Sequence, residues 1–197
     1  MLDMRARKKV SRFVDPIGRL LARIGLSPAV VTVSGLVLSV AGSVLIGSGR
    51  LTVGAAVLGF GAALDILDGV VARVTGTESA RGAFLDSTTD RLGEVAMWTG
   101  LAFHLGQDAE AGLVTLSIVA VCGSLLIPYL RAKAEALGLE GKGGLMGRAE
   151  RLLVFGLGVA LEGLGVPALV PALWILAIGS WVTVAQRFVQ TWRRLAA

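Results

Sequence analysis

Apolar residues in this chain gather into six long runs, separated by short polar or glycine-rich segments. Most of the runs approach the roughly 20 residues that a helix needs to cross about 30 Å of hydrocarbon. The fifth run is the weakest, because Glu162 and several glycines interrupt it. The pattern predicts six membrane-spanning helices, near residues 29–47, 51–72, 84–105, 111–130, 150–164 and 167–186.

A different pattern precedes the first run. Between Val10 and Ile24, apolar side chains recur at helical spacing and the arginines fall mostly between them. This arrangement is typical of an amphipathic helix that lies on a membrane surface, and a solvated basic tail is the alternative. The segment is too charged, and its apolar residues begin too late, for a cleaved signal peptide.

Composition supports a membrane protein. Of the 197 residues, 54% are apolar and 17% are charged, and the mean hydropathy of +0.75 exceeds that of ordinary soluble domains. These values exclude a disordered chain, a soluble nucleic-acid-binding domain and a disulfide-stapled secreted domain. The single cysteine, Cys122, lies in an apolar run and is expected to be a small buried residue. We expect one all-α membrane domain over residues 1–197, with a juxtamembrane segment at 1–28 and a six-helix bundle at 29–190.

Basic residues mark one side of the expected membrane. Of the 19 Lys and Arg, all except Arg50 and Arg91 lie in the N-terminal segment, in the loops after spans two and four, or at the C-terminal end. An even number of spans puts these regions on the same side, and Lys and Arg are enriched on the cytoplasmic side. The pattern predicts a multi-pass plasma-membrane protein whose termini and basic loops face the cytoplasm.

Four aspartates interrupt the apolar pattern near the cytoplasmic ends of spans two and three. Asp65 and Asp68 are three residues apart, and Asp86 and Asp90 are four apart, so each pair shares a helix face. Because a short loop joins the two helices, the two acidic faces can converge. Carboxylates near hydrocarbon are costly and repel one another, and a divalent cation with oxygen ligands is the ordinary remedy. A salt-bridge network with the arginines of the same segment is the alternative.

This segment resembles the signature of the CDP-alcohol phosphotransferase family, D-x2-D-G-x2-A-R-x8-G-x3-D-x3-D, at every position and spacing. The matching residues are Asp65, Asp68, Gly69, Ala72, Arg73, Gly82, Asp86 and Asp90. The six-span layout with a preceding surface helix is also similar to this family. The resemblance implies a homodimeric membrane enzyme that transfers the phosphatidyl group of CDP-diacylglycerol to an alcohol and releases CMP.

The same resemblance implies roles for individual residues. It makes Asp65, Asp68 and Asp86 ligands of two Mg²⁺ or Mn²⁺ ions, and it makes Asp90 the general base and a further metal ligand. The residues implied to contact the CDP-lipid are Gly69, Arg73 and Ser79, together with the segment Pro28, Ala29, Val30, Val31 and Thr32.

A second group of candidate residues lies at the ends of the last three spans. Arg131, Arg151 and Arg187 come from different spans at one expected membrane level, where arginines can bind an anionic group. Positive charge that only fixes the topology is the alternative. The segments Y-x-R-A-K-A-E, E-R-L and Q-R resemble an actinobacterial branch of the family, in which these places bind the phosphate of inositol 1-phosphate. Glycerol 3-phosphate is the other candidate acceptor.

A cation transporter is the alternative from a different class, because transporters also carry acids within membrane spans. Here the acids cluster at one face, and the chain shows no internal repeat. Glu94 continues the face of Asp86 and Asp90, either as support for the acidic site or as a helix-packing group. The single histidine and the four tryptophans are expected to pack between helices or to lie at the membrane–water interface: His104, Trp98, Trp174, Trp181 and Trp192.

Overall fold

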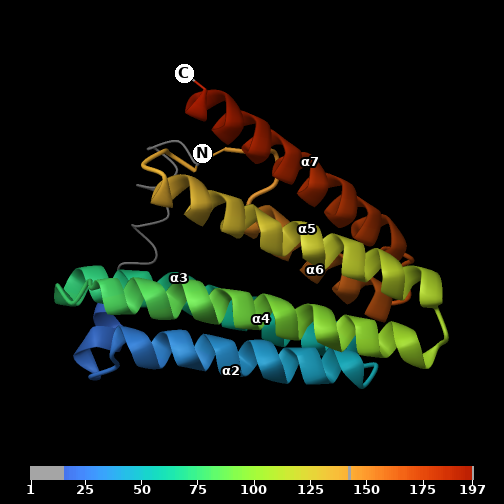
Figure 1. Ribbon diagram of the computed structural model, residues 1–197. Helices are drawn as coiled ribbons and strands as arrows, with labels where there is room; N and C mark the ends of the chain where they lie inside the picture. Colours follow the sequence, from blue (N-terminus) through green and yellow to red (C-terminus); the bar gives the residue numbers. More distant parts are fainter. Residues whose placement is uncertain (1–15, 142, 197) are drawn as a thin grey trace. The chain divides into compact units, whose positions relative to one another are not determined.

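The computed structural model describes residues 16–141 and 143–196, and in these ranges the chain is helical without strands. Residues 16–23 form one helix. Six longer helices follow it, and each carries one of the six expected spans (Figure 1): α2 (Pro28–Gly47), α3 (Leu51–Thr75), α4 (Ala80–Gln107), α5 (Ala111–Ala136), α6 (Arg148–Gly163) and α7 (Leu169–Leu195). The all-α prediction is confirmed for the described part of the chain.

Four helices, α2, α3, α5 and α7, combine the length and the hydropathy needed to cross a membrane. The chain is therefore a multi-pass membrane protein. The other two helices fall short for different reasons. Helix α6 has only 16 residues, and the first half of α4 carries the charged residues of the aspartate motif. Membrane crossing by α4 and α6 stays a prediction.

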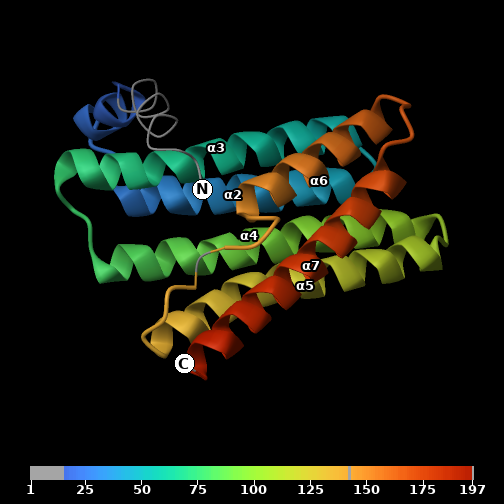
Figure 2. The ribbon, with the colours of Figure 1, turned by 90° about the horizontal axis from the view of Figure 1, so that it is seen from above.

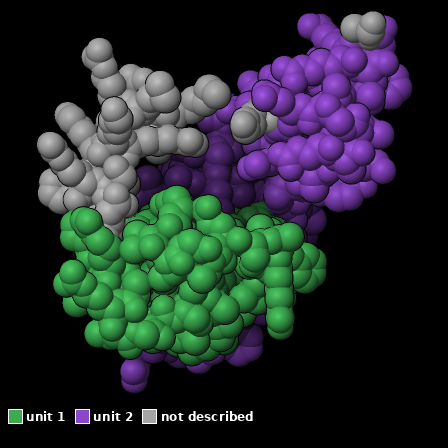
Figure 3. All heavy atoms as spheres, turned by 90° about the vertical axis from the view of Figure 1, so that its left-hand side faces the viewer, with its two compact units in different colours: residues 1–43, 57–97 green, residues 44–56, 98–197 purple. Residues whose placement is uncertain are grey.

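The chain packs as two compact units, which Figure 3 shows in different colours. Unit 1 comprises residues 1–43 and 57–97, and unit 2 comprises residues 44–56 and 98–197. Most of α2 and α3 and the first part of α4 belong to unit 1, whereas α5, α6 and α7 belong to unit 2.

Glycines bring the helices of unit 1 close together. A Cβ on Gly61 of α3 would lie 3.0 Å from the carbonyl oxygen of Gly35 of α2, and a Cβ on Gly93 of α4 would lie 3.5 Å from Ser39 Cβ of α2. Figures 1 and 2 show α2, α3 and α4 running side by side. Small residues at such positions let membrane helices gain close packing, and this packing holds the helices that carry the aspartates.

In unit 2, helix α7 packs against both α5 and α6. A Cβ on Gly123 of α5 would lie 3.0 Å from Ser180 Cβ of α7, and a Cβ on Gly158 of α6 would overlap Ala172 of α7. The same use of small residues therefore builds both units.

Exposed apolar side chains are abundant, as expected where lipid replaces water. Trp174, Trp181 and Trp192 are exposed, whereas Trp98 is buried against the ring of Phe155, with ring centroids 5.1 Å apart. The prediction for Cys122 is wrong, because its side chain is exposed on α5. An apolar run in a membrane helix has a lipid-facing side as well as a packed side, so an apolar neighbourhood in sequence does not imply burial.

The predicted amphipathic helix over Val10–Ile24 is described only from residue 16 onward. Within this part, Ile17, Leu20 and Ile24 are all exposed. These side chains are available to a membrane surface, and that placement remains a prediction. Val10 to Asp15 lie outside the described residues.

Candidate metal and nucleotide site

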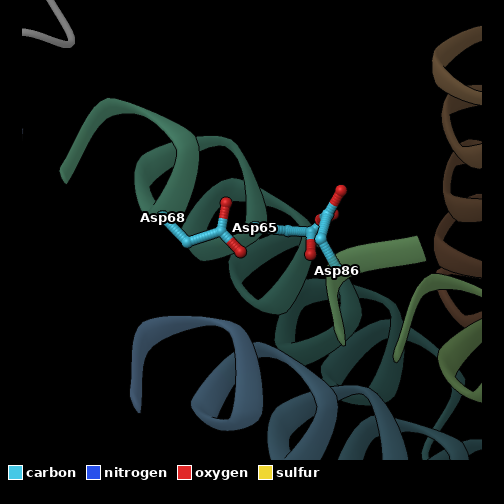
Figure 4. A group of neighbouring side chains, drawn as sticks. All are labelled: Asp65, Asp68 and Asp86. Carbon is cyan, nitrogen blue, oxygen red and sulfur yellow. The ribbon is translucent and has the colours of Figure 1, made fainter. Parts of the chain in front are cut away.

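Three of the four candidate aspartates meet between α3 and α4 in unit 1. One carboxylate oxygen from each of Asp65, Asp68 and Asp86 lies within 4.8 Å of the other two. Figure 4 shows Asp65 and Asp68 on one helix, with the carboxylate of Asp68 directed toward the other two side chains. The three-residue spacing on α3 and the short connection to α4 produce this arrangement. We call these three residues the acidic group.

The acidic group fits the ligand chemistry of a hard divalent cation. Mg²⁺ and Mn²⁺ prefer oxygen donors, and carboxylates supply both the donor atoms and the compensating charge. Asp68 is 6% exposed, and Asp65 and Asp86 are half-buried. Like charges held this close repel one another, and a cation between them relieves the repulsion.

A hydroxyl group on α2 contacts the buried member of the acidic group. Thr32 Oγ1 donates a hydrogen bond to Asp68 Oδ2, and it also lies 3.0 Å from the carbonyl oxygen of Pro28. Both Thr32 and Asp68 are buried. The contact fixes the orientation of the Asp68 carboxylate. Sequence reasoning placed Thr32 near the nucleotide but missed this contact, because the partners lie 36 positions apart on different helices.

A pocket of about 220 Å³ opens beside the acidic group, and Asp68 and Asp86 line it. Val30 and Val31 are not part of this lining, although Pro28, Ala29 and Thr32 of the same segment are. Six of the eight residues expected to contact the CDP-lipid line the pocket: Pro28, Ala29, Thr32, Gly69, Arg73 and Ser79.

The N-terminus of α4 opens into the same pocket. Ser79 caps this helix, because its Oγ accepts a hydrogen bond of 3.1 Å from the backbone N–H of Gly82. Ser79 and Gly82 both line the pocket. The positive end of the helix dipole favours an anion at this place.

Gly69 leaves room in the pocket wall. A Cβ at this position would meet only Arg73 Nη1, at an ordinary contact distance of 3.6 Å. Packing within the protein therefore does not demand a glycine here. The missing side chain instead widens the pocket beside Asp68, where a ligand can approach the backbone.

Asp90 is not part of the acidic group. It is four residues beyond Asp86 on α4, and its Oδ2 lies 3.4 Å from Arg91 Nη2. Arg91 Nη1 in turn donates a 2.8 Å hydrogen bond to Glu94 Oε2. Glu94 is buried, so it anchors the arginine that lies beside Asp90. The sequence singled out Glu94, but it did not identify Arg91 as its partner.

The three candidate acceptor arginines lie near one another in unit 2. Arg131 is near the end of α5, Arg151 is in the first turn of α6, and Arg187 is on α7. Both Arg131 and Arg151 are close enough to repel the guanidinium of Arg187. Arg151 is buried, whereas Arg131 is exposed and forms a 2.8 Å ion pair with Glu135. We call these three residues the arginine cluster.

Comparison with known proteins defines the class. The profile of the CDP-alcohol phosphatidyltransferase family matches residues 25–192. The chain therefore belongs to this family of membrane enzymes.

Within this family, the chain is similar in sequence to phosphatidylinositol phosphate synthases. The chain is 40% identical over 193 residues to the phosphatidylinositol phosphate synthase of Corynebacterium glutamicum, which covers 96% of this chain and 88% of the relative. It is 38% identical over 205 residues to the synthase of the same name from Mycobacterium tuberculosis, covering 97% and 91%.

Two solved structures of the Mycobacterium tuberculosis synthase are also similar. The crystal structure with CDP-DAG bound matches with a TM-score of 0.86 at 38% identity, covering 92% of this chain and 94% of that one. The structure in complex with manganese and citrate matches with a TM-score of 0.85, again at 38% identity, covering 91% and 88%.

Proposed function

We propose that the chain transfers the phosphatidyl group of CDP-diacylglycerol to inositol 1-phosphate and releases CMP. The observation that carries this proposal is the complete aspartate signature, of which seven of the eight residues line one pocket or form the acidic group beside it; the eighth, Asp90, is four residues beyond Asp86 on α4. The likeness to phosphatidylinositol phosphate synthases over nearly the whole chain supports the choice of acceptor.

The donor, CDP-diacylglycerol, binds in the pocket beside the acidic group. Asp65, Asp68 and Asp86, joined by Asp90, hold two Mg²⁺ or Mn²⁺ ions in this proposal, and the manganese complex of the Mycobacterium tuberculosis synthase supports it. When bound, such ions supply charge neutralisation for the pyrophosphate and for the departing CMP. The residues that contact the CDP-lipid are Pro28, Ala29, Val30, Val31, Thr32, Gly69, Arg73 and Ser79. The CDP-DAG complex of that synthase and the anion-favouring N-terminus of α4 support this assignment.

Asp90 acts as the general base. The acceptor hydroxyl oxygen bonds to the phosphatidyl phosphorus, the bond from that phosphorus to the bridging oxygen breaks, and the hydroxyl proton passes to the Asp90 carboxylate. Arg91, anchored by Glu94, holds this carboxylate in place through the 3.4 Å contact.

The arginine cluster binds the phosphate of the acceptor. Arg131 and Arg151 both repel the guanidinium of Arg187, so an anionic ligand among them is favourable, and their planar donors match phosphate oxygens. An alcohol without a phosphate would bring no negative charge to the cluster, where Glu135 offsets the repulsion only in part. The cluster therefore favours a phosphorylated acceptor over free inositol.

The proposal includes a membrane arrangement. Helices α4 and α6 cross the membrane with the four apolar helices, and both termini and the active site face the cytoplasm of a plasma-membrane protein. The distribution of Lys and Arg supports this orientation. The family match over residues 25–192 supports a single domain. Homodimerisation is part of the proposal, and nucleic acid is not among its partners.

The test is CMP release from CDP-diacylglycerol by the purified chain in detergent with Mg²⁺ or Mn²⁺. Separate reactions receive inositol 1-phosphate, glycerol 3-phosphate or free inositol. We expect fast release only with inositol 1-phosphate, and none after chelation of the metal. Asp108→Asn is a matched control, because Asp108 does not line the pocket and its loss should leave activity unchanged. Release with glycerol 3-phosphate alone would overturn the acceptor assignment.

A further inference from the structure

The segment between α5 and α6, described at residues 137–141 and 143–147, is tied to α7 through its backbone. The N–H of Leu145 donates a 2.8 Å hydrogen bond to Gln186 Oε1. The N–H of Met146 donates a 2.9 Å hydrogen bond to Thr183 Oγ1. Two side chains of α7 thus bind consecutive backbone groups of this segment, which we call the α5–α6 segment.

The α5–α6 segment also holds Arg187. Arg187 Nε donates a 3.0 Å hydrogen bond to the carbonyl oxygen of Gly143 in this segment. Arg187 Nη1 donates a 2.9 Å hydrogen bond to the carbonyl oxygen of Ile127 on α5. Two of the five N–H groups of the guanidinium are therefore fixed on backbone carbonyls. The other three have a set direction, and within the described residues they donate no hydrogen bond, so they can bind an anion.

Thr183 connects the α5–α6 segment to α7 through its buried hydroxyl group. It is fully buried, and its hydroxyl donates to the carbonyl oxygen of Gly179 at 2.7 Å while accepting from Met146. Gly144 has a φ of +105°, and a Cβ on it would overlap Thr183 Cγ2. The α5–α6 segment therefore fits α7 at one register, with Thr183, Gln186 and Arg187 on the same helix face.

We propose that Thr183 and Gln186 are positioning residues for acceptor binding, because they fix the α5–α6 segment whose Gly143 carbonyl orients Arg187. This inference rests on the proposed function, in which Arg187 binds the acceptor phosphate. Losing either anchor loosens the segment, and Arg187 must then be ordered at the moment of binding. That ordering weakens affinity for a phosphomonoester without changing the residues that bind the donor.

The test compares Thr183→Val, which keeps the shape but removes the hydroxyl, with Thr183→Ser, which keeps the hydroxyl. We expect Thr183→Val to raise the KM for inositol 1-phosphate about 3- to 10-fold, as for one lost neutral hydrogen bond. The KM for CDP-diacylglycerol and kcat at saturating acceptor should stay near wild type. Thr183→Ser should restore most of the affinity.

Two further variants separate positioning from general damage. Gln186→Ala removes an exposed side chain, so the fold should be retained while the acceptor KM rises. Thr115→Val is the matched control, because Thr115 Oγ1 bonds only the carbonyl oxygen of Ala111 in its own helix at 2.9 Å. Its kinetic constants should not change.

Hydrogen exchange supplies a readout that does not depend on turnover. The amides of Leu145 and Met146 should exchange faster in Thr183→Val and in Gln186→Ala than in the wild type. Faster exchange with an unchanged acceptor KM would overturn the positioning role, and so would an equal rise in both KM values. A wild-type protein that makes no inositol lipid would contradict the proposed function itself, which is a different result.

Discussion

The acidic group and the arginine cluster are built in opposite ways. The acidic group comes from two helices joined by the four residues 76–79, and its members lie within one 22-residue stretch of the chain, from Asp65 to Asp86. The arginine cluster takes one residue from each of three helices, between positions 131 and 187. The first is local in sequence, whereas the second depends on long-range packing in unit 2.

Because the two regions are assembled differently, single substitutions in them should have different effects on binding and turnover. In the acidic group every carboxylate is a candidate ligand of the same ions, so one neutral replacement disables the whole arrangement. In the arginine cluster each guanidinium contributes separately to binding the acceptor phosphate, so the loss of one arginine weakens acceptor binding without preventing it. Substitutions in the two regions should therefore differ in size and also in which kinetic constant they change.

The largest effect is expected in the acidic group. Asp68→Asn or Asp65→Asn should reduce turnover to background and weaken the binding of Mn²⁺, because an amide cannot replace a charged ligand of a hard cation. Turnover is measured as CMP release, and metal binding by titration of the purified variant. Near-normal activity in a well-folded variant would remove the metal role of that residue.

Asp90→Asn should separate chemistry from donor binding. The amide has nearly the same size but cannot accept the proton, so kcat should fall about 10²- to 10⁴-fold at saturating metal. Affinity for CDP-diacylglycerol should be largely retained. If donor affinity falls as much as kcat does, Asp90 acts mainly as a metal ligand.

Substitutions in the arginine cluster should act on the acceptor alone. Arg131→Ala, Arg151→Ala or Arg187→Ala should each raise the KM for inositol 1-phosphate roughly 10- to 150-fold, the worth of one charge-assisted contact to phosphate. The KM for the donor should change far less. Arg193→Ala, in the last turn of α7, is the matched control. Unchanged acceptor kinetics in all three variants would mean that the arginines serve topology only.

Among the substitutions that test the acidic group against the arginine cluster, the smallest effect is expected at Thr32, which contacts the acidic group from α2. Thr32→Val removes the hydrogen bond to Asp68 and should weaken Mn²⁺ binding about 10-fold, as is typical when a group that orients a metal ligand is lost. Thr32→Ser keeps the hydroxyl and should bind Mn²⁺ like the wild type. The titration is done without CDP-lipid, so that the pocket contact of Thr32 does not contribute.

The same contrast explains what the sequence could predict. Hydropathy located all six long helices, because apolar runs of this length have few alternatives in a membrane. The proximity of Asp65, Asp68 and Asp86 followed from helical spacing and one short loop, both of which are local properties. The exposure of Cys122 and the absence of Val30 and Val31 from the pocket lining were not predicted, because each depends on which face of a helix meets a neighbour.

Contacts between segments far apart in the chain could not be predicted from the sequence. Nothing in the pattern indicates that Thr32 bonds Asp68, since this contact depends on rotamers in the packed helices. The ion pairs of Arg91 with Asp90 and Glu94 are local in sequence, and the sequence offered arginine salt bridges only as an alternative to a metal site. The attachment of the α5–α6 segment to Thr183 and Gln186 spans about 40 positions. Gly143 and Gly144 adopt positive φ values in this segment, which glycine permits, and no expectation was drawn from them at the level of sequence.

The most direct test of the central claim is a competition reaction followed by mass spectrometry of the lipid product. The purified chain receives CDP-diacylglycerol, Mg²⁺, and equal concentrations of inositol 1-phosphate and glycerol 3-phosphate. The account predicts phosphatidylinositol phosphate as the dominant product, with the balance unaltered by Arg193→Ala and total product sharply reduced by Arg187→Ala. Phosphatidylglycerol phosphate as the dominant product would contradict the account.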